Sequence, residues 1–168
     1  MITLEALNGM PVSEFVAALA GVFEHSPWVG ERTAPARPFA SREHLLQTML
    51  AIVAAASLAE QMALIRAHPE LGAVGRRNAQ LTKASAREQK RAGLEACSDE
   101  QFAELRRLNS AYAEKFGFPF ILFVRGHEPR SIIATCQSRL HNAAEVERRT
   151  ALAEIGMIAA QRLAELVG

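Results

Sequence analysis

The chain is organised around Arg66-Ala67-His68-Pro69-Glu70-Leu71-Gly72, a run that a polar connector joins to Ser85-Ala86-Arg87-Glu88-Gln89. Pro69 predicts the end of a helix, because proline cannot donate a backbone hydrogen bond and disfavours helical geometry in the residue before it. Ser85-x-x-Glu88 has the spacing of a capping box, which predicts that a second helix begins there. The pattern therefore predicts two helices joined by a loop, with a histidine at the junction.

Similar signals divide the rest of the chain into helices. Apolar residues recur every three or four positions in several segments, which is the spacing of one face of a helix. Ser41 is a predicted N-cap, and Ser57-x-x-Glu60 and Ser98-x-x-Gln101 are predicted capping boxes. Gly117 is a predicted C-terminal cap for the long helix that follows Ser98. Roughly eight helices are expected in total.

Two segments interrupt this helical pattern. The segment from Gly72 to Lys83 contains two glycines and three basic residues with little periodicity, so it is predicted to be a loop, with helix from Ser85 to about Ala96. Phe118-Pro119-Phe120-Ile121-Leu122-Phe123-Val124 has the composition of a strand but no partner run, and we expect buried extended chain rather than a sheet. The predicted fold is all-α: a single domain over residues 1–168, built as a helical bundle with one extended segment near residues 118–124.

The composition excludes several classes of function. The chain has 19 basic and 18 acidic residues, which argues against a partner bound by bulk charge, such as nucleic acid or an anionic membrane. Leu45 to Leu64 is apolar-rich but contains polar residues, and is better explained by two soluble helices than by a membrane span. Cys97 and Cys136 have no metal or redox spacing, and the N-terminus does not resemble a signal peptide. We therefore expect a cytoplasmic protein with reduced thiols.

No familiar cofactor motif is present in the sequence. None of the five histidines has another histidine three or four positions away, so no helix face carries a two-histidine metal site. The sequence also lacks a phosphate-binding loop, a dinucleotide fingerprint and a nucleophile elbow. We expect neither a metal nor an organic cofactor.

Three sites combine polar chemistry with a helical setting, and the residues alone leave two interpretations for each. His68 either caps the last carbonyls of its helix or acts as an acid–base group near neutral pH. A capping box would by itself account for Ser85 and Glu88, but a polar helix N-terminus can also bind a substrate. Arg162 lies on the otherwise apolar final helix, where its guanidinium either extends into water or holds a carboxylate.

Four segments taken together resemble a known family, that of 2-oxo-4-hydroxy-4-carboxy-5-ureidoimidazoline (OHCU) decarboxylase. Their order and spacing match over nearly the whole chain, starting from Ser26-Pro27-Trp28 and Arg37-Pro38-Phe39. The sequence departs from the family pattern at Glu70, often aspartate, and at Gly72, often alanine. The four segments are His68-Pro69-Glu70-Leu71, Ser85-x-x-Glu88-Gln89, Asn109-x-x-Tyr112-x-x-Lys115-Phe116-Gly117-Phe118-Pro119-Phe120 and Ile158-x-x-x-Arg162-Leu163.

The resemblance implies an all-helical, cofactor-free decarboxylase that forms (S)-allantoin in the last step of the uricase route of urate degradation. It also implies a homodimer and a functional link to 5-hydroxyisourate hydrolase, the enzyme of the preceding step. The implied catalytic residues are His68, Glu88 and Arg162. The implied substrate-binding residues are Pro69, Ser85, Gln89, Phe118, Phe120, Ile121 and Leu122.

The chemistry of such a substrate is consistent with a site made only of ordinary side chains. One ring carbon carries both a carboxylate and a hydroxyl, and it adjoins a C=N carbon. When carbon dioxide leaves, the adjacent C=N accepts the electron pair, so the substrate is its own electron sink and needs neither pyridoxal nor thiamine. The protein must orient the ring, stabilise the intermediate and deliver a proton to one face.

Two other functions fit the same residues. One is another cofactor-free lyase or isomerase that acts on a related ureido or hydantoin compound. The other is a helical binding or scaffold module without catalysis, which predicts that His68, Glu88 and Arg162 are scattered and exposed to solvent.

Overall fold

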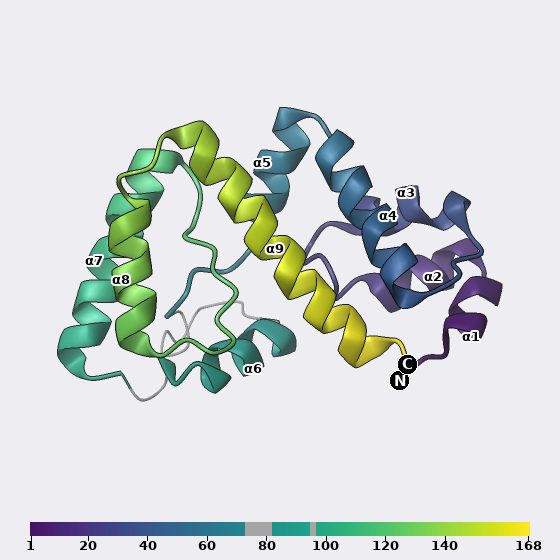
Figure 1. Ribbon diagram of the computed structural model, residues 1–168, viewed down its shortest axis with the longest axis horizontal. Coiled ribbons are helices and arrows are strands. Elements are labelled where there is room, and N and C mark those ends of the chain that lie inside the picture. Colours follow the sequence, from purple (N-terminus) through teal and green to yellow (C-terminus); the bar gives the residue numbers. More distant parts are fainter. Residues whose placement is uncertain (73–81, 95–96) are drawn as a thin grey trace. The chain divides into compact units, whose positions relative to one another are not determined.

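The computed structural model describes residues 1–72, 82–94 and 97–168, and these residues are mainly helical (Figure 1). Within these ranges there are nine α-helices, one short 3-10 helix and no β-strand beyond a single bridge, which confirms the all-α prediction. The elements are α1 (Leu4–Gly9), α2 (Val12–Leu19), α3 (Pro27–Thr33), η1 (Ala34–Ala36), α4 (Arg42–Ala55), α5 (Leu58–Arg66), α6 (Lys83–Arg91), α7 (Asp99–Phe116), α8 (Pro129–Arg139) and α9 (Ala144–Leu166).

The chain forms two compact units. Unit 1 comprises Met1–Ala67 together with Ile155–Gly168, and unit 2 comprises His68–Glu154. Each unit has buried apolar residues of its own. The expectation of a single domain over residues 1–168 stays a prediction.

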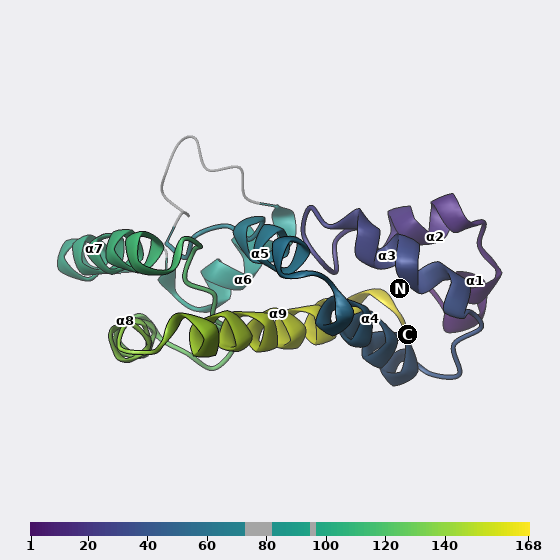
Figure 2. The ribbon, with the colours of Figure 1, turned by 90° about the horizontal axis from the view of Figure 1, so that it is seen from above.

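In unit 1, helix α3 packs against both α2 and α4 (Figures 1 and 2). The C-terminal part of α9 comes close to α4, since a Cβ built on Gly156 would lie 3.2 Å from Cδ2 of Leu50. The two ends of the chain meet in a parallel bridge between Ile2 and Val167. Fully buried residues of this unit include Leu7, Phe15, Val29, Leu45, Met49, Ile155 and Leu163.

In unit 2, helices α7 and α8 lie side by side (Figures 1 and 2). The rings of Tyr112 and Phe116 on α7 pack against those of Phe118 and Phe120, with Tyr112 in edge contact with both. Residues 118–124 are mostly buried and belong to no helix or strand, which confirms the prediction of buried extended chain.

Several predicted helix ends are confirmed. The Ser41 side chain accepts the backbone N–H of His44, and both predicted capping boxes, at Ser57 and at Ser98, are formed in full. Gly117 ends α7 in the left-handed conformation, with φ of 75°, which glycine adopts at no steric cost. Local sequence decides these ends because each cap joins residues within one helical turn.

The predicted capping box at Ser85 and Glu88 is wrong. Helix α6 begins at Lys83, and the N-cap is Thr82, whose side chain accepts the backbone N–H of Ser85 at 3.2 Å. Thr82 precedes Ser85 by three residues, the spacing that lets a threonine cap the helix one turn earlier. Ser85 therefore lies inside the helix with its side chain buried.

The predicted extent of this helix is also too long. Helix α6 ends at Arg91 rather than near Ala96, and Gly93 follows with a φ of 70°. The predicted loop from Gly72 to Lys83 falls mostly on residues 73–81, which lie outside the described residues, as do residues 95–96.

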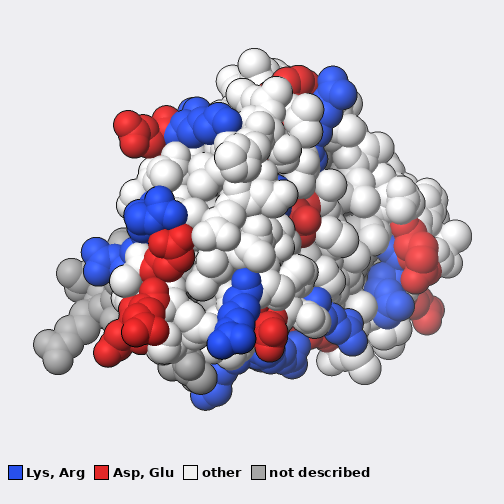
Figure 3. Space-filling view, turned by 60° about the vertical axis from the view of Figure 1, so that its left-hand side comes forward, with Lys and Arg blue, Asp and Glu red and all other residues white. Residues whose placement is uncertain are grey.

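Charged side chains of both signs are interspersed on the face shown in Figure 3. Exposed ion pairs on the two units include Arg107 with Glu104 at 2.8 Å and Arg32 with Glu60 at 2.5 Å. No single described helix has the length and apolarity of a membrane span. Among the described helices, only the pair α4 and α5 taken together is long and apolar enough, and this pair is bent by 117°.

Candidate functional site

His68 is the second residue after the end of α5. The helix ends at Arg66, and the backbone N–H of Ala67 still donates to the carbonyl of Ala63 at 3.0 Å. The His68 side chain is not in solvent, because the residue is only 6% exposed, and the half-buried Pro69 follows it directly. The His68 side chain therefore lies in a buried setting next to a proline with a restricted backbone.

The turn after His68 is held by amide side chains from two helices. Gln89 of α6 accepts the backbone N–H of Gly72 at 3.0 Å and donates to the carbonyl of Glu70 at 3.2 Å. Asn109 of α7 donates to the carboxylate of Glu70 at 3.0 Å and to the carbonyl of Leu71 at 2.8 Å. Both amides are buried, so the position of this turn is tightly specified.

Gly72 closes the turn in the left-handed conformation, which glycine adopts at no steric cost. Its φ is +80°, and a Cβ at this position would lie 2.8 Å from Cδ2 of Leu105. The glycine therefore permits both the left-handed backbone and the close approach of α7.

One side of α6 carries three of the predicted site residues. Glu88 and Gln89 lie three and four positions after Ser85, so each projects from the same side of the helix as Ser85. Ser85 and Gln89 are buried and Glu88 is half-buried. Because Gln89 bonds directly to the turn at Glu70 and Gly72, this side of α6 lies next to the segment that carries His68 and Pro69.

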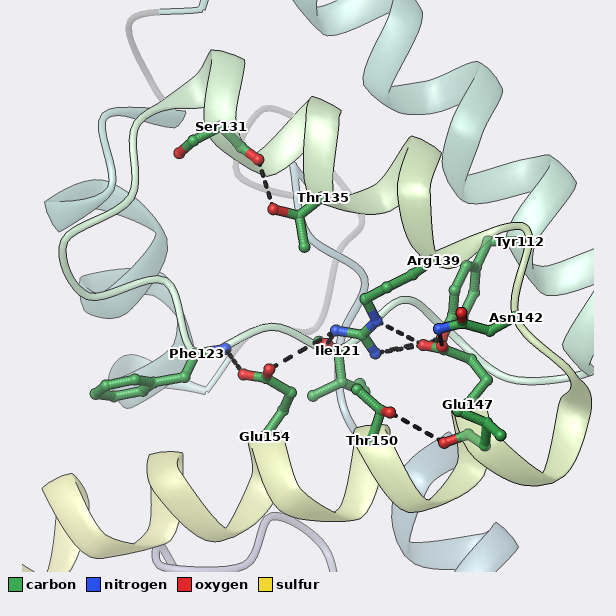
Figure 4. Close-up of polar contacts among 11 residues, drawn as sticks. Tyr112, Ile121, Phe123, Ser131, Thr135, Arg139, Asn142, Glu147, Thr150 and Glu154 are labelled. Atoms are coloured by element: carbon green, nitrogen blue, oxygen red, sulfur yellow. Dashed lines mark hydrogen bonds and ion pairs between the residues drawn. The ribbon is translucent and has the colours of Figure 1, made fainter.

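The extended segment is fixed through its backbone (Figure 4). Arg139 of α8 donates from Nη1 to the carbonyl of Ile121 at 2.7 Å. Glu154 of α9 accepts the backbone N–H of Phe123 at 2.7 Å. The predicted site residues Phe118, Phe120, Ile121 and Leu122 are all buried in this segment.

A buried polar cluster holds Arg139 in place. Its guanidinium contacts Glu147 through Nε at 2.6 Å and through Nη2 at 2.5 Å. The Tyr112 hydroxyl and the Asn142 amide also donate to the Glu147 carboxylate, the amide at 2.8 Å. Burial, and then the hydrogen bond to Glu147, hold the pKa of Tyr112 far above its usual value, so this phenol stays protonated.

Helix α7 supports both the turn and the extended segment. Asn109 bonds to the turn after His68, while Tyr112, one helical turn further on, packs against Phe118 and Phe120. The structure thus groups nine of the ten predicted site residues in unit 2, around α6, the turn and the extended segment.

Arg162 is the tenth residue and belongs to unit 1. Its side chain is buried, with Nη2 3.6 Å from the carboxylate of Glu24 and Nη1 donating to the carbonyl of Gly21 at 3.3 Å. The alternative in which this guanidinium extends into water is therefore wrong. Glu24 is itself 2% exposed, and sequence reasoning missed it because no local pattern marks a carboxylate whose partner lies at the other end of the chain.

Neither cysteine has the properties of a nucleophile. Burial raises the pKa of the Cys136 thiol to about 12 and raises the pKa of Cys97 as well. A thiol acts as a nucleophile only as the thiolate, and both cysteines stay protonated near neutral pH. In the part of the chain that the structure describes, no three His, Cys, Asp or Glu side chains gather closely enough to hold a metal ion.

Comparison with known proteins points to a single family. The family model of OHCU decarboxylase matches residues 8–164. The 2-oxo-4-hydroxy-4-carboxy-5-ureidoimidazoline decarboxylase of Haloferax volcanii is 41% identical over 98% of this chain and 95% of its own length. The uric acid degradation bifunctional protein of Bacillus sp. (strain TB-90) is 44% identical over 99% of this chain, which spans only 32% of that protein.

Solved structures agree at the level of the fold. A crystal structure of (S)-allantoin synthase matches all of this chain and 54% of its own, with a TM-score of 0.79 and 26% identity. A crystal structure of OHCU decarboxylase in the presence of (S)-allantoin matches 89% of this chain and 96% of its own, with a TM-score of 0.73 and 23% identity.

Proposed function

The chain belongs to the OHCU decarboxylase family, and we propose on that basis that it converts OHCU to (S)-allantoin in the degradation of urate. The observation that carries this proposal is the match to the Haloferax volcanii decarboxylase over almost the full length of both chains. The buried His68, next to the polar side of α6, supports it, because a decarboxylase needs a proton source beside its substrate.

In the proposed reaction the bond between the ring carbon and the carboxylate carbon breaks. Carbon dioxide leaves, and the electron pair moves into the adjacent C=N group. His68 then delivers a proton to one face of the neighbouring carbon, which carries the ureido group, and this produces a single enantiomer. The carbon that lost the carboxylate becomes a carbonyl as its hydroxyl gives up its proton. Because the substrate itself accepts the electron pair, the protein has to supply only orientation, hydrogen bonds and a proton.

The other residues are proposed to bind and orient the substrate. Glu88 accepts substrate N–H groups, and the planar guanidinium of Arg162 binds the carboxylate or the ureido carbonyl. Pro69 restricts the backbone beside His68. The remaining proposed contacts come from Ser85, Gln89, Phe118, Phe120, Ile121 and Leu122.

The proposal extends to partners. We propose a homodimer, and a functional link to the 5-hydroxyisourate hydrolase that supplies OHCU. The bifunctional uric acid degradation proteins support such a pathway link, since a region similar to this chain makes up about a third of them (32% and 33%). A cytoplasmic location stays a prediction.

Circular dichroism of freshly prepared OHCU tests the activity. The wild-type protein is expected to accelerate the decay of OHCU and to give (S)-allantoin, whereas the spontaneous reaction gives a racemate. Unchanged decay of OHCU would contradict the proposal. Turnover of a related ureido or hydantoin compound in its place would then favour the alternative lyase, and no turnover at all would favour a binding module.

A further inference from the structure

In the extended segment, the peptide groups on both sides of Leu122 are bonded to charged side chains. The peptide group before Leu122 is anchored through the Ile121 carbonyl, which accepts from Arg139 at 2.7 Å. The peptide group after it is anchored through the Phe123 N–H, which donates to Glu154 at 2.7 Å. Figure 4 shows that the two anchors come from different helices, Arg139 from α8 and Glu154 from α9.

These anchors determine where the backbone groups of Leu122 point. In a trans peptide the carbonyl and the N–H point in opposite directions. Holding the Ile121 carbonyl toward Arg139 therefore turns the Leu122 N–H away from Arg139. Holding the Phe123 N–H toward Glu154 turns the Leu122 carbonyl away from Glu154 in the same manner.

The backbone donor and acceptor of Leu122 have no partner in the part of the chain that the structure describes. Among the described residues, no hydrogen bond is made to the backbone N–H or carbonyl of Leu122, although the residue is only 5% exposed. Buried backbone groups are nearly always paired. A donor and an acceptor on one residue match a ligand that offers a carbonyl and an N–H together, as a ureido group or a ring amide does.

We propose that Arg139 and Glu154 are positioning residues for the reaction, which hold the Leu122 backbone in the orientation that binds the ureido or ring-amide part of the substrate. The proposal rests on the function proposed above. Neither side chain is itself a catalytic residue here, because each contacts the backbone of the segment rather than the reacting atoms.

The surrounding contacts favour positioning over a simple contribution to stability. Arg139 is fixed on its other side by Glu147 and stacks over the ring of Phe120, with its guanidinium carbon 4.7 Å from the ring centre. Buried ion pairs often add little net stability, because desolvation offsets their attraction. Arg139 and Glu154 are buried or nearly buried, and both bond to the backbone of the extended segment. Together they fix the conformation of that segment around Leu122.

Glu154 gives the sharper test, because its role as an acceptor can be separated from its charge. Glu154→Ala removes the acceptor for the Phe123 N–H, Glu154→Gln keeps an acceptor oxygen without the charge, and Glu154→Asp keeps the charge but withdraws it by one methylene. Glu145→Ala is the matched control, because Glu145 lies on the same helix and its exposed carboxylate pairs with Arg148 and Arg149 of that helix. Steady-state decarboxylation of OHCU is measured for each variant after its helical circular dichroism has been checked.

Glu154→Ala is expected to raise KM about tenfold and to change kcat less than about threefold, since a lost contact to a non-reacting group weakens binding more than chemistry. Glu154→Gln is expected to restore a KM close to that of the wild type, and Glu154→Asp is not. If Glu154→Ala does not fold, the comparison of Glu154→Gln with Glu154→Asp decides the question alone.

Two results would overturn the positioning role while leaving the activity in place. One is a KM for Glu154→Ala within about twofold of Glu145→Ala. The other is a normal Glu154→Asp beside an impaired Glu154→Gln, which would mean that the charge near Arg139 matters rather than the acceptor. A wild-type protein that does not accelerate OHCU decay would instead overturn the proposed function, and this proposal with it.

Discussion

At the scale of single residues, His68 is where one side chain is expected to decide the rate. Asparagine is similar in size and can hydrogen-bond, but it does not exchange a proton near neutral pH. His68→Asn should therefore leave a folded protein whose kcat falls roughly 100-fold or more, the usual scale of general acid–base catalysis. Polarimetry should show product that becomes more racemic as the spontaneous reaction takes over. Normal turnover that still gives only (S)-allantoin would mean that the proton comes from another group.

Arg162→Lys separates the charge of this residue from its shape. Lysine keeps the positive charge but cannot form two parallel hydrogen bonds with a carboxylate or a ureido carbonyl. Substrate binding is expected to weaken by about 1.5–3 kcal/mol, the cost of losing a charge-assisted contact. KM should be measured below the melting temperature of the variant, because Arg162 also contacts buried Glu24. Arg32→Lys is the control, since its ion pair with Glu60 is exposed, and wild-type kinetics for Arg162→Lys would place this arginine outside the site.

The sequence points to residues of the candidate site where they belong to a segment that matches the family. It does not point to the supporting residues that only the fold brings together. His68 and Arg162 belong to matching segments. Glu24, Arg139 and Glu154 do not, because each bonds to a partner that lies far away in the sequence or to a backbone group of another element. No local spacing carries that information.

At the scale of elements, helix α6 has different residues for capping its N-terminus and for the proposed contact with the substrate. Thr82 caps this helix, so Thr82→Ala should lower the free energy of unfolding by about 1 kcal/mol. Glu88 has no part in the cap, and Glu88→Gln should lower kcat or raise KM with little change in stability. Urea unfolding and OHCU turnover, measured on both variants, test the distinction. A sharp loss of stability in Glu88→Gln with intact turnover would make the carboxylate structural.

Helix ends were predictable to the extent that they depend on neighbours in the sequence. The caps at Ser41, Ser57, Ser98 and Gly117 each join groups within about one helical turn. At α6 two hydroxyl residues, Thr82 and Ser85, have the right chemistry, and sequence reasoning chose the second. Burial decides between them, because Ser85 lies on the side of the helix that packs inward.

At the scale of the whole molecule, stability is expected to fall at alkaline pH because of Tyr112. Its phenol has a pKa of about 10 in an unfolded chain, and burial raises that pKa in the folded state. A raised folded pKa contributes stability that is complete below about pH 10 and is lost above it, by at most about 1.4 kcal/mol per pH unit. Cys136, whose pKa burial raises from 9.0 to about 12, acts in the same direction.

The chain has a single tyrosine, so its ionisation can be followed directly by ultraviolet absorbance. Tyrosinate should appear near pH 10 in urea and only on unfolding in native buffer. Urea midpoints compared between about pH 8 and about pH 11 should fall less for Tyr112→Phe than for the wild type, because phenylalanine has no proton to lose. Tyrosinate formation near pH 10 in the folded protein would show that this hydroxyl is accessible.

The bridge between the two ends of the chain has a mechanical consequence. Ile2 donates to the carbonyl of Leu166 at 2.8 Å and accepts from Gly168 at 3.1 Å, and the paired residues run parallel. Pulling the N-terminus and the C-terminus apart therefore drives the two segments along each other in opposite directions. The force loads both hydrogen bonds at once, in shear, instead of peeling them open one after the other. Both hydrogen bonds of this bridge must break before the tension reaches the helices of unit 1.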